Sequence, residues 1–196
     1  MHEPGHFADR AARHFAALRQ RDRGGSDPKP PFPDGWFDLD AGLYADFGAM
    51  FYLAALVPFH AGRSLAAATS TFEPALRLGQ YHIFRSDGFP RAFVSWAGLS
   101  PEVERRLALK RTPLRAEEWN GGPSVWLIDF VAPFGHMREI VPRLTENPAL
   151  RRLRALWLTE GSDSYRIIEW TRAAAGGRVD ERVFSPARFA RHLDES

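Results

Sequence analysis

A single carboxylate stands inside the most apolar strand-like stretch of the chain. Asp129 lies within residues 126–135, WLIDFVAPFG, whose length and β-forming composition favour a strand buried on both faces. Burial of an ionised carboxylate without a partner is very costly, so Asp129 requires a cation, a hydroxyl or an imidazole beside it. Asp129 is therefore a candidate site residue. The alternative interpretation is a structural Asp that accepts hydrogen bonds from loop amides.

His60 is the candidate imidazole. It follows Pro58 at the end of an apolar helical stretch, so we expect it in a loop where a substrate can reach the ring. The alternative interpretation is a packed structural histidine. Five other histidines fall on expected exposed helix faces, in a strand pattern or at a helix start: His6, His14, His192, His82 and His136.

The sequence lacks the residue patterns that several kinds of chemistry require. The chain has no cysteine, which excludes a thiol nucleophile, a disulfide framework and a cysteine zinc site. No histidine pairs with another ligand at metal-binding spacing on an expected helix, so we expect no metal. The phosphate loop of nucleotide hydrolases and the glycine-rich turn of dinucleotide-binding domains are both missing from the sequence.

The composition is that of an ordinary globular protein of 196 residues, with one domain and a modest positive net charge of +2. Nearly all basic residues are arginine, and this balance suits an acidic protein partner at least as well as nucleic acid. No secretory signal is apparent, and the most apolar helical stretch, residues 47–59, is too short to span a membrane. We therefore expect a cytoplasmic protein without a membrane span.

The periodicity predicts an N-terminal extension, residues 1–38, consisting of an amphipathic helix and a Pro/Gly-rich linker, followed by a domain over residues 39–196. In the domain we expect an α/β or α+β fold on one mostly antiparallel sheet of about five strands. The expected helices cover residues 40–57, 64–72, 100–109, 136–144 and 185–193, and the expected strands cover residues 81–85, 91–96, 126–131, 154–159 and 165–172.

Three segments together carry a family resemblance. Residues 80–100 (QYHIFRSDGFPRAFVSWAGLS), residues 116–119 (AEEW) and the Asp129 strand with its APFG ending keep the order and spacing of the toxin-activating lysine acyltransferases. These are the hemolysin-activating C proteins that accompany RTX toxins. The chain resembles that family over about residues 42–175.

The resemblance implies a fold similar to the Gcn5-related N-acetyltransferases and a homodimer. It also implies transfer of a fatty acyl group from acyl carrier protein to internal lysines of an RTX-type protoxin. His60 and Asp129 occupy the places of the family's catalytic pair, with His60 as base or transient acyl carrier and Asp129 orienting it. The same comparison makes Trp96, Trp119 and Thr71 candidate substrate-binding residues.

The expected donor is the phosphopantetheine thioester of acyl carrier protein, with no permanently bound cofactor. Enzymes of the acetyltransferase fold that use coenzyme A hold its pyrophosphate in a loop of the form Arg/Gln-x-x-Gly-x-Gly/Ala at a helix start, and no such loop follows an expected strand. An acidic carrier protein would dock on a basic face instead. One candidate face comprises Arg105, Arg106, Lys110, Arg111 and Arg115, and a second comprises Arg151, Arg152 and Arg154. The alternative for each is a solvated surface.

Two positions depart from the family pattern. Val57 stands where a serine is common, and Thr71 stands where an asparagine is typical, which puts the rate, the acyl chain and the donor in question. Two other functions therefore stay open. One is an acetyltransferase-fold enzyme that uses acyl-coenzyme A on another amine, and the other is a non-catalytic binding protein or chaperone for an exported toxin.

Overall fold

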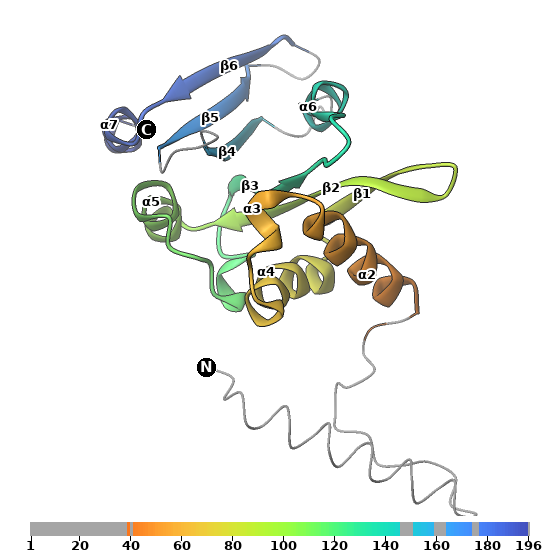
Figure 1. Cartoon of the computed structure of the whole chain (residues 1–196). Coiled ribbons are helices and arrows are strands. Elements are labelled where there is room, and N and C mark those ends of the chain that lie inside the picture. The colour runs from red at the N-terminus through yellow and green to blue at the C-terminus, as the bar shows by residue number, and fades with distance from the viewer. Residues whose placement is uncertain (1–38, 40, 146–150, 159–163, 174–176, 196) are drawn as a thin grey trace, which may run out of the picture. The chain divides into compact units, whose positions relative to one another are not determined.

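The computed structural model describes residues 39, 41–145, 151–158, 164–173 and 177–195 (Figure 1). The chain divides into two compact units, residues 1–44 and 45–196. The expected N-terminal helix and linker, residues 1–38, lie outside the described residues. The elements are α2 (Ala41–Ala55), α3 (Pro58–Ala61), α4 (Leu65–Leu78), β1 (Tyr81–Ser86), β2 (Phe89–Leu99), α5 (Pro101–Lys110), the 3-10 helix η1 (Ala116–Glu118), β3 (Ser124–Val131), α6 (Met137–Thr145), β4 (Arg152–Leu158), β5 (Tyr165–Arg172), β6 (Val179–Phe184) and α7 (Pro186–Asp194).

The described strands form one mixed sheet in the order β1-β2-β3-β4-β5-β6. Neighbouring strands are antiparallel except β3 and β4, which are parallel and connected through α6. The expected mostly antiparallel sheet is confirmed, but it has six strands rather than five. The sequence pattern missed β6 because four of its six residues are exposed on an edge strand, so no buried alternation marks it.

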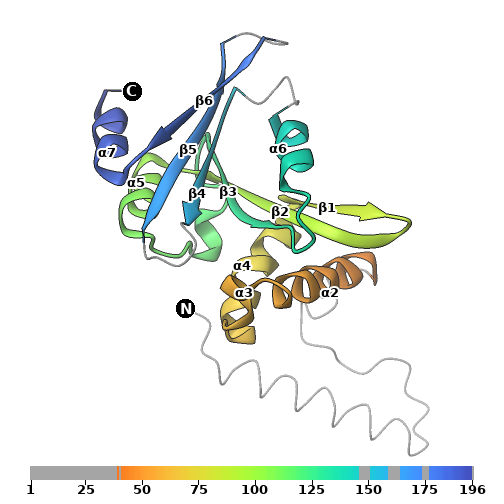
Figure 2. The same cartoon turned by 45° about the horizontal axis from the view of Figure 1, so that its top comes forward.

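The second unit buries a core on each face of this sheet (Figure 2). On one face, side chains of α4, α5, η1 and α7 pack in a cluster that includes Ala75, Leu107, Trp119 and Phe189. On the other face, Ile140 of α6 packs against β2, β3, β4 and β5. We call these the four-helix face and the α6 face. The alternation of side chains along each strand decides which face a residue lines.

Local sequence signals explain where several elements begin. Ser64, Ser100 and Ser185 are N-caps whose hydroxyls accept hydrogen bonds from backbone N–H groups in the first turns of α4, α5 and α7. The β1–β2 hairpin turns at Asp87 and Gly88, which both have positive φ, as a type I′ turn requires. The strands expected over residues 81–85 and 91–96 and the helix expected from residue 100 are thereby confirmed.

Two expectations around His60 were wrong. His60 lies in the one-turn helix α3, not in a loop, because Pro58 occupies the first helical position, where its fixed φ favours a new helix. Helix α4 does not stop at Phe72 but continues to Leu78 through Pro74, since burial of Phe72, Ala75 and Leu76 outweighs the lost backbone hydrogen bond.

The pairing of β3 with β4 is short. Only Trp126 with Arg154 and Leu127 with Ala155 are in register, and beyond them the two strands no longer pair. A β-bulge between Ser95 and Trp96 also interrupts the β2–β3 pairing at this level. The parallel junction therefore divides the sheet into two halves, β1–β3 and β4–β6.

Within the described residues, no helix is long and apolar enough to cross a membrane.

Candidate active site

His60 is held at the C-terminal part of α3 by aromatic neighbours. Its ring meets Phe59 edge-on with centroids 4.9 Å apart and lies 6.4 Å from the ring of Phe72. Phe72 is fully buried and packs in turn against Phe93 of β2 at 5.4 Å. A half-buried imidazole is thus fixed on a rigid part of the four-helix face.

Asp129 lies on β3 directly opposite Ser95 of β2 and is almost fully buried. The Ser95 hydroxyl donates a hydrogen bond to Asp129 Oδ2 at 2.8 Å, and the Asp129 backbone N–H donates to Ser95 Oγ at 3.1 Å. Burial raises the pKa of Asp129 from 3.8 to about 6, although the Ser95 hydroxyl and the charge of Arg63 act in the opposite direction. A hydroxyl is one of the three kinds of partner, a cation, a hydroxyl or an imidazole, that we expected beside the buried Asp129 carboxylate.

Arg63 connects the two candidate residues. Its Nη1 lies 3.3 Å from His60 Nδ1 and 3.9 Å from Asp129 Oδ1, while its Nη2 donates to Thr71 Oγ1 at 2.7 Å. The sequence reasoning missed Arg63, because a single arginine beside a short helix has no pattern of its own. Its position three residues after His60, close to one helical turn, is the signal that could have found it.

These surroundings keep the His60 ring neutral. Burial, and secondarily the positive charge of Arg63, lower the pKa of His60 from 6.5 to about 4. Asp129 does not cancel this effect. Arg63 Nη1 lies 3.3 Å from His60 Nδ1, whereas among the described residues no hydrogen bond or ion pair joins the Asp129 carboxylate to the ring.

A cavity of about 530 Å³ opens beside these groups, a size typical of small-molecule sites. At its polar end lie His60, Arg63, Thr71 and Asp129. The remaining wall is mostly apolar, and it comes from α5, the segment after it, and the separated ends of β3 and β4. These lining residues are Val57, Phe59, Leu107, Arg111, Pro113, Leu114, Trp119, Ile128, Phe130, Met137, Leu156, Trp157 and Leu158.

The three candidate substrate-binding residues do not share one cavity. Thr71 and Trp119 line the cavity beside His60, whereas Trp96 points to the α6 face and lines a second cavity of about 640 Å³. Trp96 follows the regular alternation of β2, which places it with Ala92 and Val94 on the α6 face. The β-bulge adds its extra residue, Ile128, to β3, since Ser95 pairs with Asp129 and Trp96 with Leu127. The prediction for Trp96 therefore loses its geometric connection to His60.

The first candidate docking face is partly neutralised by its own neighbours. Arg105 pairs with Asp194 of α7 at 2.6 Å, and Arg106 pairs with the buried Glu118. Arg115 also pairs with Glu118, at 2.6 Å. Lys110 is exposed at the end of α5, and the adjacent exposed Arg111 lines the cavity. Of the residues in the first set, these last two lie best for an anionic partner.

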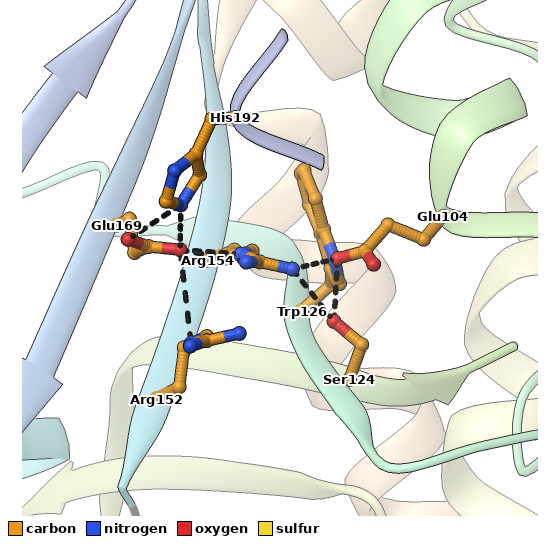
Figure 3. A network of polar contacts seen from close by, with 7 residues as sticks. All are labelled: Glu104, Ser124, Trp126, Arg152, Arg154, Glu169 and His192. Atoms are coloured by element: carbon orange, nitrogen blue, oxygen red, sulfur yellow. Dashed lines mark hydrogen bonds and ion pairs between the residues drawn. The ribbon is translucent and has the colours of Figure 1, made fainter. Parts of the chain in front are cut away.

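The second candidate docking face loses Arg154, which is 2% exposed, whereas Arg151 and Arg152 are exposed. Figure 3 shows the Arg154 guanidinium between two buried carboxylates, Glu169 of β5 and Glu104 of α5. It donates to Glu169 Oε2 through Nε at 2.8 Å. Trp126 Nε1 donates to Glu104 Oε1 at 2.7 Å, and His192 Nε2 lies 3.3 Å from Glu169 Oε1. We call these residues, with Ser124, the junction network.

The described residues contain no group of three side chains suited to hold a metal ion.

Comparison with known proteins gives the family. The model of the RTX toxin acyltransferase family matches residues 43–171, close to the range expected from the sequence. The chain is 33% identical over 136 residues to a leukotoxin-activating lysine-acyltransferase of Aggregatibacter actinomycetemcomitans, covering 69% of this chain and 79% of that protein.

Two further relatives have similar descriptions. An RTX-I toxin-activating lysine-acyltransferase of Actinobacillus pleuropneumoniae is 31% identical over 138 residues, which is 70% of this chain and 78% of that protein. A protein-lysine myristoyltransferase of Escherichia coli is 38% identical over 88 residues, or 45% and 51% of the two chains. The matched range contains His60, Arg63, Thr71 and Asp129. The chain therefore belongs to the RTX toxin acyltransferase family.

Proposed function

We propose that this protein transfers a fatty acyl group from acyl carrier protein to lysine side chains of an RTX-type protoxin. The observation that carries the proposal is the cavity in which a neutral imidazole and a buried carboxylate lie at one end of a largely apolar wall. The names of the relatives, toxin-activating lysine-acyltransferases and a protein-lysine myristoyltransferase, support the acceptor and the fatty acyl group.

In this reaction His60 acts as the base. A lysine amine is nucleophilic only without its extra proton, and the neutral ring at physiological pH can accept a proton as the amine nitrogen attacks the thioester carbonyl carbon. The C–N bond forms, the C–S bond breaks, and the imidazolium returns the proton to the leaving thiolate. The products are an amide on lysine and the free thiol of the carrier.

Asp129 supports the charged intermediate state of the ring. Its carboxylate is fixed by Ser95 and lies within 3.9 Å of the Arg63 guanidinium that contacts His60. As the imidazolium forms, a nearby anion in a low-dielectric site lowers its energy. The role is electrostatic, because in this structure the side-chain contacts between Asp129 and His60 pass through Arg63.

The apolar wall accommodates the acyl chain. Leu107, Leu114 and Leu156 line the cavity together with Ile128, so an alkyl chain there is removed from water. Trp119 is 1% exposed, and its Nε1 has no hydrogen-bond partner among the described residues, which leaves an N–H for a polar group of the donor. The location of the cavity between diverging neighbouring strands fits a fold like the Gcn5-related N-acetyltransferases.

Two features favour a carrier protein over coenzyme A as the donor. The segment from β3 to α6, residues 132–136, contains Gly135 but not the pattern Arg/Gln-x-x-Gly-x-Gly/Ala that would cradle a pyrophosphate. Arg111 lines the cavity and the exposed Lys110 directly precedes it, so an acidic protein that presents its thioester on a flexible arm can dock there.

Co-expression with an RTX-type protoxin tests the function. We expect fatty-acyl mass increments on internal lysines of the protoxin, measured by peptide mass spectrometry. His60→Ala and Asp129→Ala should abolish them, while His82→Ala, a control on the exposed side of β1, should not.

Purified components then separate the alternatives. Increments formed only with acyl-coenzyme A would favour the other donor, and soluble co-expression without increments would favour a binding protein. An acyl group found on the wild-type chain itself, in the absence of acceptor, would make His60 an acyl carrier rather than a base.

A further inference from the structure

The contact between Arg63 and His60 has a defined chemical direction. A guanidinium can only donate hydrogen bonds, so His60 Nδ1, 3.3 Å from Arg63 Nη1, must act as acceptor. An imidazole nitrogen accepts only when it carries no proton. The neutral ring in this arrangement therefore has its proton on Nε2, and its lone pair on Nδ1 points at Arg63.

The guanidinium is held in this place from its other side. Arg63 Nη2 donates to Thr71 Oγ1 at 2.7 Å and to the Ala67 carbonyl at 3.2 Å, and Thr71 itself donates to the same carbonyl at 3.2 Å. These partners lie on the first two turns of α4. Nη1 is thus the end of the guanidinium that lies between the two candidate residues, 3.3 Å from His60 Nδ1 and 3.9 Å from Asp129 Oδ1.

The ring that the proposed function requires differs from this resting arrangement. A base must offer a free lone pair, and in the Nε2-protonated ring the sole lone pair is the one that Arg63 occupies. We propose that Arg63 is a positioning residue that masks His60 Nδ1 in the free protein, and that substrate binding moves its Nη1 from His60 to Asp129, which exposes Nδ1. The masking of Nδ1 does not depend on the proposed function, whereas the move of Nη1 on substrate binding rests on it.

The move is small and its proton balance is simple. Nη1 needs to approach Asp129 Oδ1 by about 1 Å to reach hydrogen-bond distance. The lysine proton then passes to Nδ1, and from there to the leaving thiolate. While Nδ1 is protonated it can no longer accept from Arg63, so the charged ring and the Arg63–Asp129 ion pair favour each other.

The charged groups around the ring are few. Among the described residues that line the cavity, these are Arg63 beside α3, Asp129 from β3 and Arg111 after α5. Arg63 alone of these contacts the ring. Burial is the larger cause of the lowered pKa and Arg63 the smaller, so removal of the Arg63 charge should raise the pKa of His60 part of the way from about 4 toward the ordinary value.

Nitrogen-15 NMR of the histidine-labelled full chain tests the masking without any substrate. The His60 signals are identified by their loss in His60→Gln. In wild type we expect a protonated Nε2, an unprotonated Nδ1 and a titration midpoint near the low pKa. Arg63→Met should move the Nδ1 shift to that of a nitrogen without a hydrogen-bond donor and raise the midpoint above about 4, although burial should still keep it below 6.5. Arg77→Met, on the exposed side of α4 beside Glu73, should change neither.

A protonated Nδ1 in wild type, or an Arg63→Met protein with unchanged shift and midpoint, would overturn the masking even if acyl transfer were fully established. The pH profile tests the move. In Arg63→Met the acid limb of kcat should shift to higher pH in step with the midpoint, with Arg63→Lys between the two proteins. At pH values above that limb, the Met variant also lacks the Arg63–Asp129 ion pair that favours the charged ring, so its kcat should be lower than that of wild type. An acid limb that stays at the wild-type pH in the Met variant would contradict an unmasking step.

Discussion

At the scale of single residues, His60 and Asp129 have opposite effects on the pH dependence of stability. Folding raises the pKa of Asp129 from 3.8 to about 6, so this residue makes stability fall as pH rises between those values. Folding lowers the pKa of His60 from 6.5 to about 4, so that residue makes stability rise with pH over nearly the same window. The two effects oppose each other in the wild-type protein.

Asp129→Asn should reveal this opposition. Asn keeps an acceptor for the Ser95 hydroxyl but has no charge to bury, so above pH 6 the variant should be more stable by up to about 3 kcal/mol. Urea unfolding at pH 4, 5, 6 and 7.5 measures the difference. His60→Gln is the matched comparison. It removes the effect that makes stability rise with pH, so the stability of this variant should fall as pH rises from about 4 to about 6. An Asn variant that is less stable than wild type at pH 7.5 would contradict the raised pKa.

The sequence predicted the need for a partner at Asp129 but not which partner it has. An apolar run around a carboxylate is visible in one segment, whereas Ser95 and Arg63 come from distant positions that only the sheet register and the α3–α4 turn bring together. Resemblance pointed to His60, and its accessible location was predicted. The helix that carries it was not, because a four-residue helix has too few residues for a periodic pattern.

At the scale of elements, Gly98 explains how Trp119 comes to line the cavity. The Gly98 N–H donates to the Trp119 carbonyl at 2.8 Å, and the Gly98 carbonyl accepts from the N–H groups of Gly121 and Gly122. A Cβ on Gly98 would lie 2.5 Å from the Gly122 carbonyl oxygen, closer than any real contact. The glycine of the SWAGLS segment thus allows the η1–β3 connection to lie directly on β2.

Gly98→Ala should therefore destabilise the protein by roughly 2–3 kcal/mol, since backbone rather than a flexible side chain must move. Thermal unfolding followed by circular dichroism measures this, with tryptophan fluorescence reporting on Trp119. Gly48→Ala in α2 is the control, because a Cβ there meets nothing within 4 Å and alanine favours the helix. Equal stability of the Gly98 variant would refute the close approach.

The junction network joins the two halves of the sheet. Arg154→Met should cost about 3–5 kcal/mol, because it leaves Glu104 and Glu169 buried without their shared cation. Arg152→Met should cost less than about 1 kcal/mol, since that half-exposed side chain lies 3.8 Å from Glu169. Denaturant unfolding compares the two variants. Adding Glu104→Gln and Glu169→Gln to Arg154→Met should recover much of the loss, and a loss that stays unchanged would point to packing instead of charge.

At the scale of the whole molecule, several of the arginines that give the chain its positive charge are not available to bind a partner. Arg105 and Arg106 are paired internally, and Arg154 is buried, so the basic composition overstates the surface available to an acidic partner. Exposure and pairing depend on tertiary contacts, which is why the sequence could not rank its own arginines. A homodimer, expected from the resemblance, stays a prediction that light scattering of the full chain would measure.

Charge reversal at the cavity tests the docking surface. Lys110→Glu with Arg111→Glu should raise KM for acyl carrier protein at least tenfold and leave kcat nearly unchanged, with less dependence on salt than wild type. Initial rates at several salt concentrations provide the comparison. Arg188→Glu on the exposed side of α7 changes the net charge away from the cavity and is the control. A fall in kcat with unchanged KM would place these side chains in catalysis instead.

The short parallel junction also has a consequence for folding. Each half of the sheet pairs only with its neighbours along the chain, so each can form from local contacts, whereas β3 and β4 meet only after α6 has crossed over. Closure must also desolvate Arg154 and its two carboxylates at once. We expect the junction to form last and to open first under denaturant. Amide hydrogen exchange would then show the N–H groups that join β3 to β4, around Leu127 and Ala155, exchanging before those of the β1–β2 and β4–β5 pairs, so that the cavity is lost while both halves remain folded.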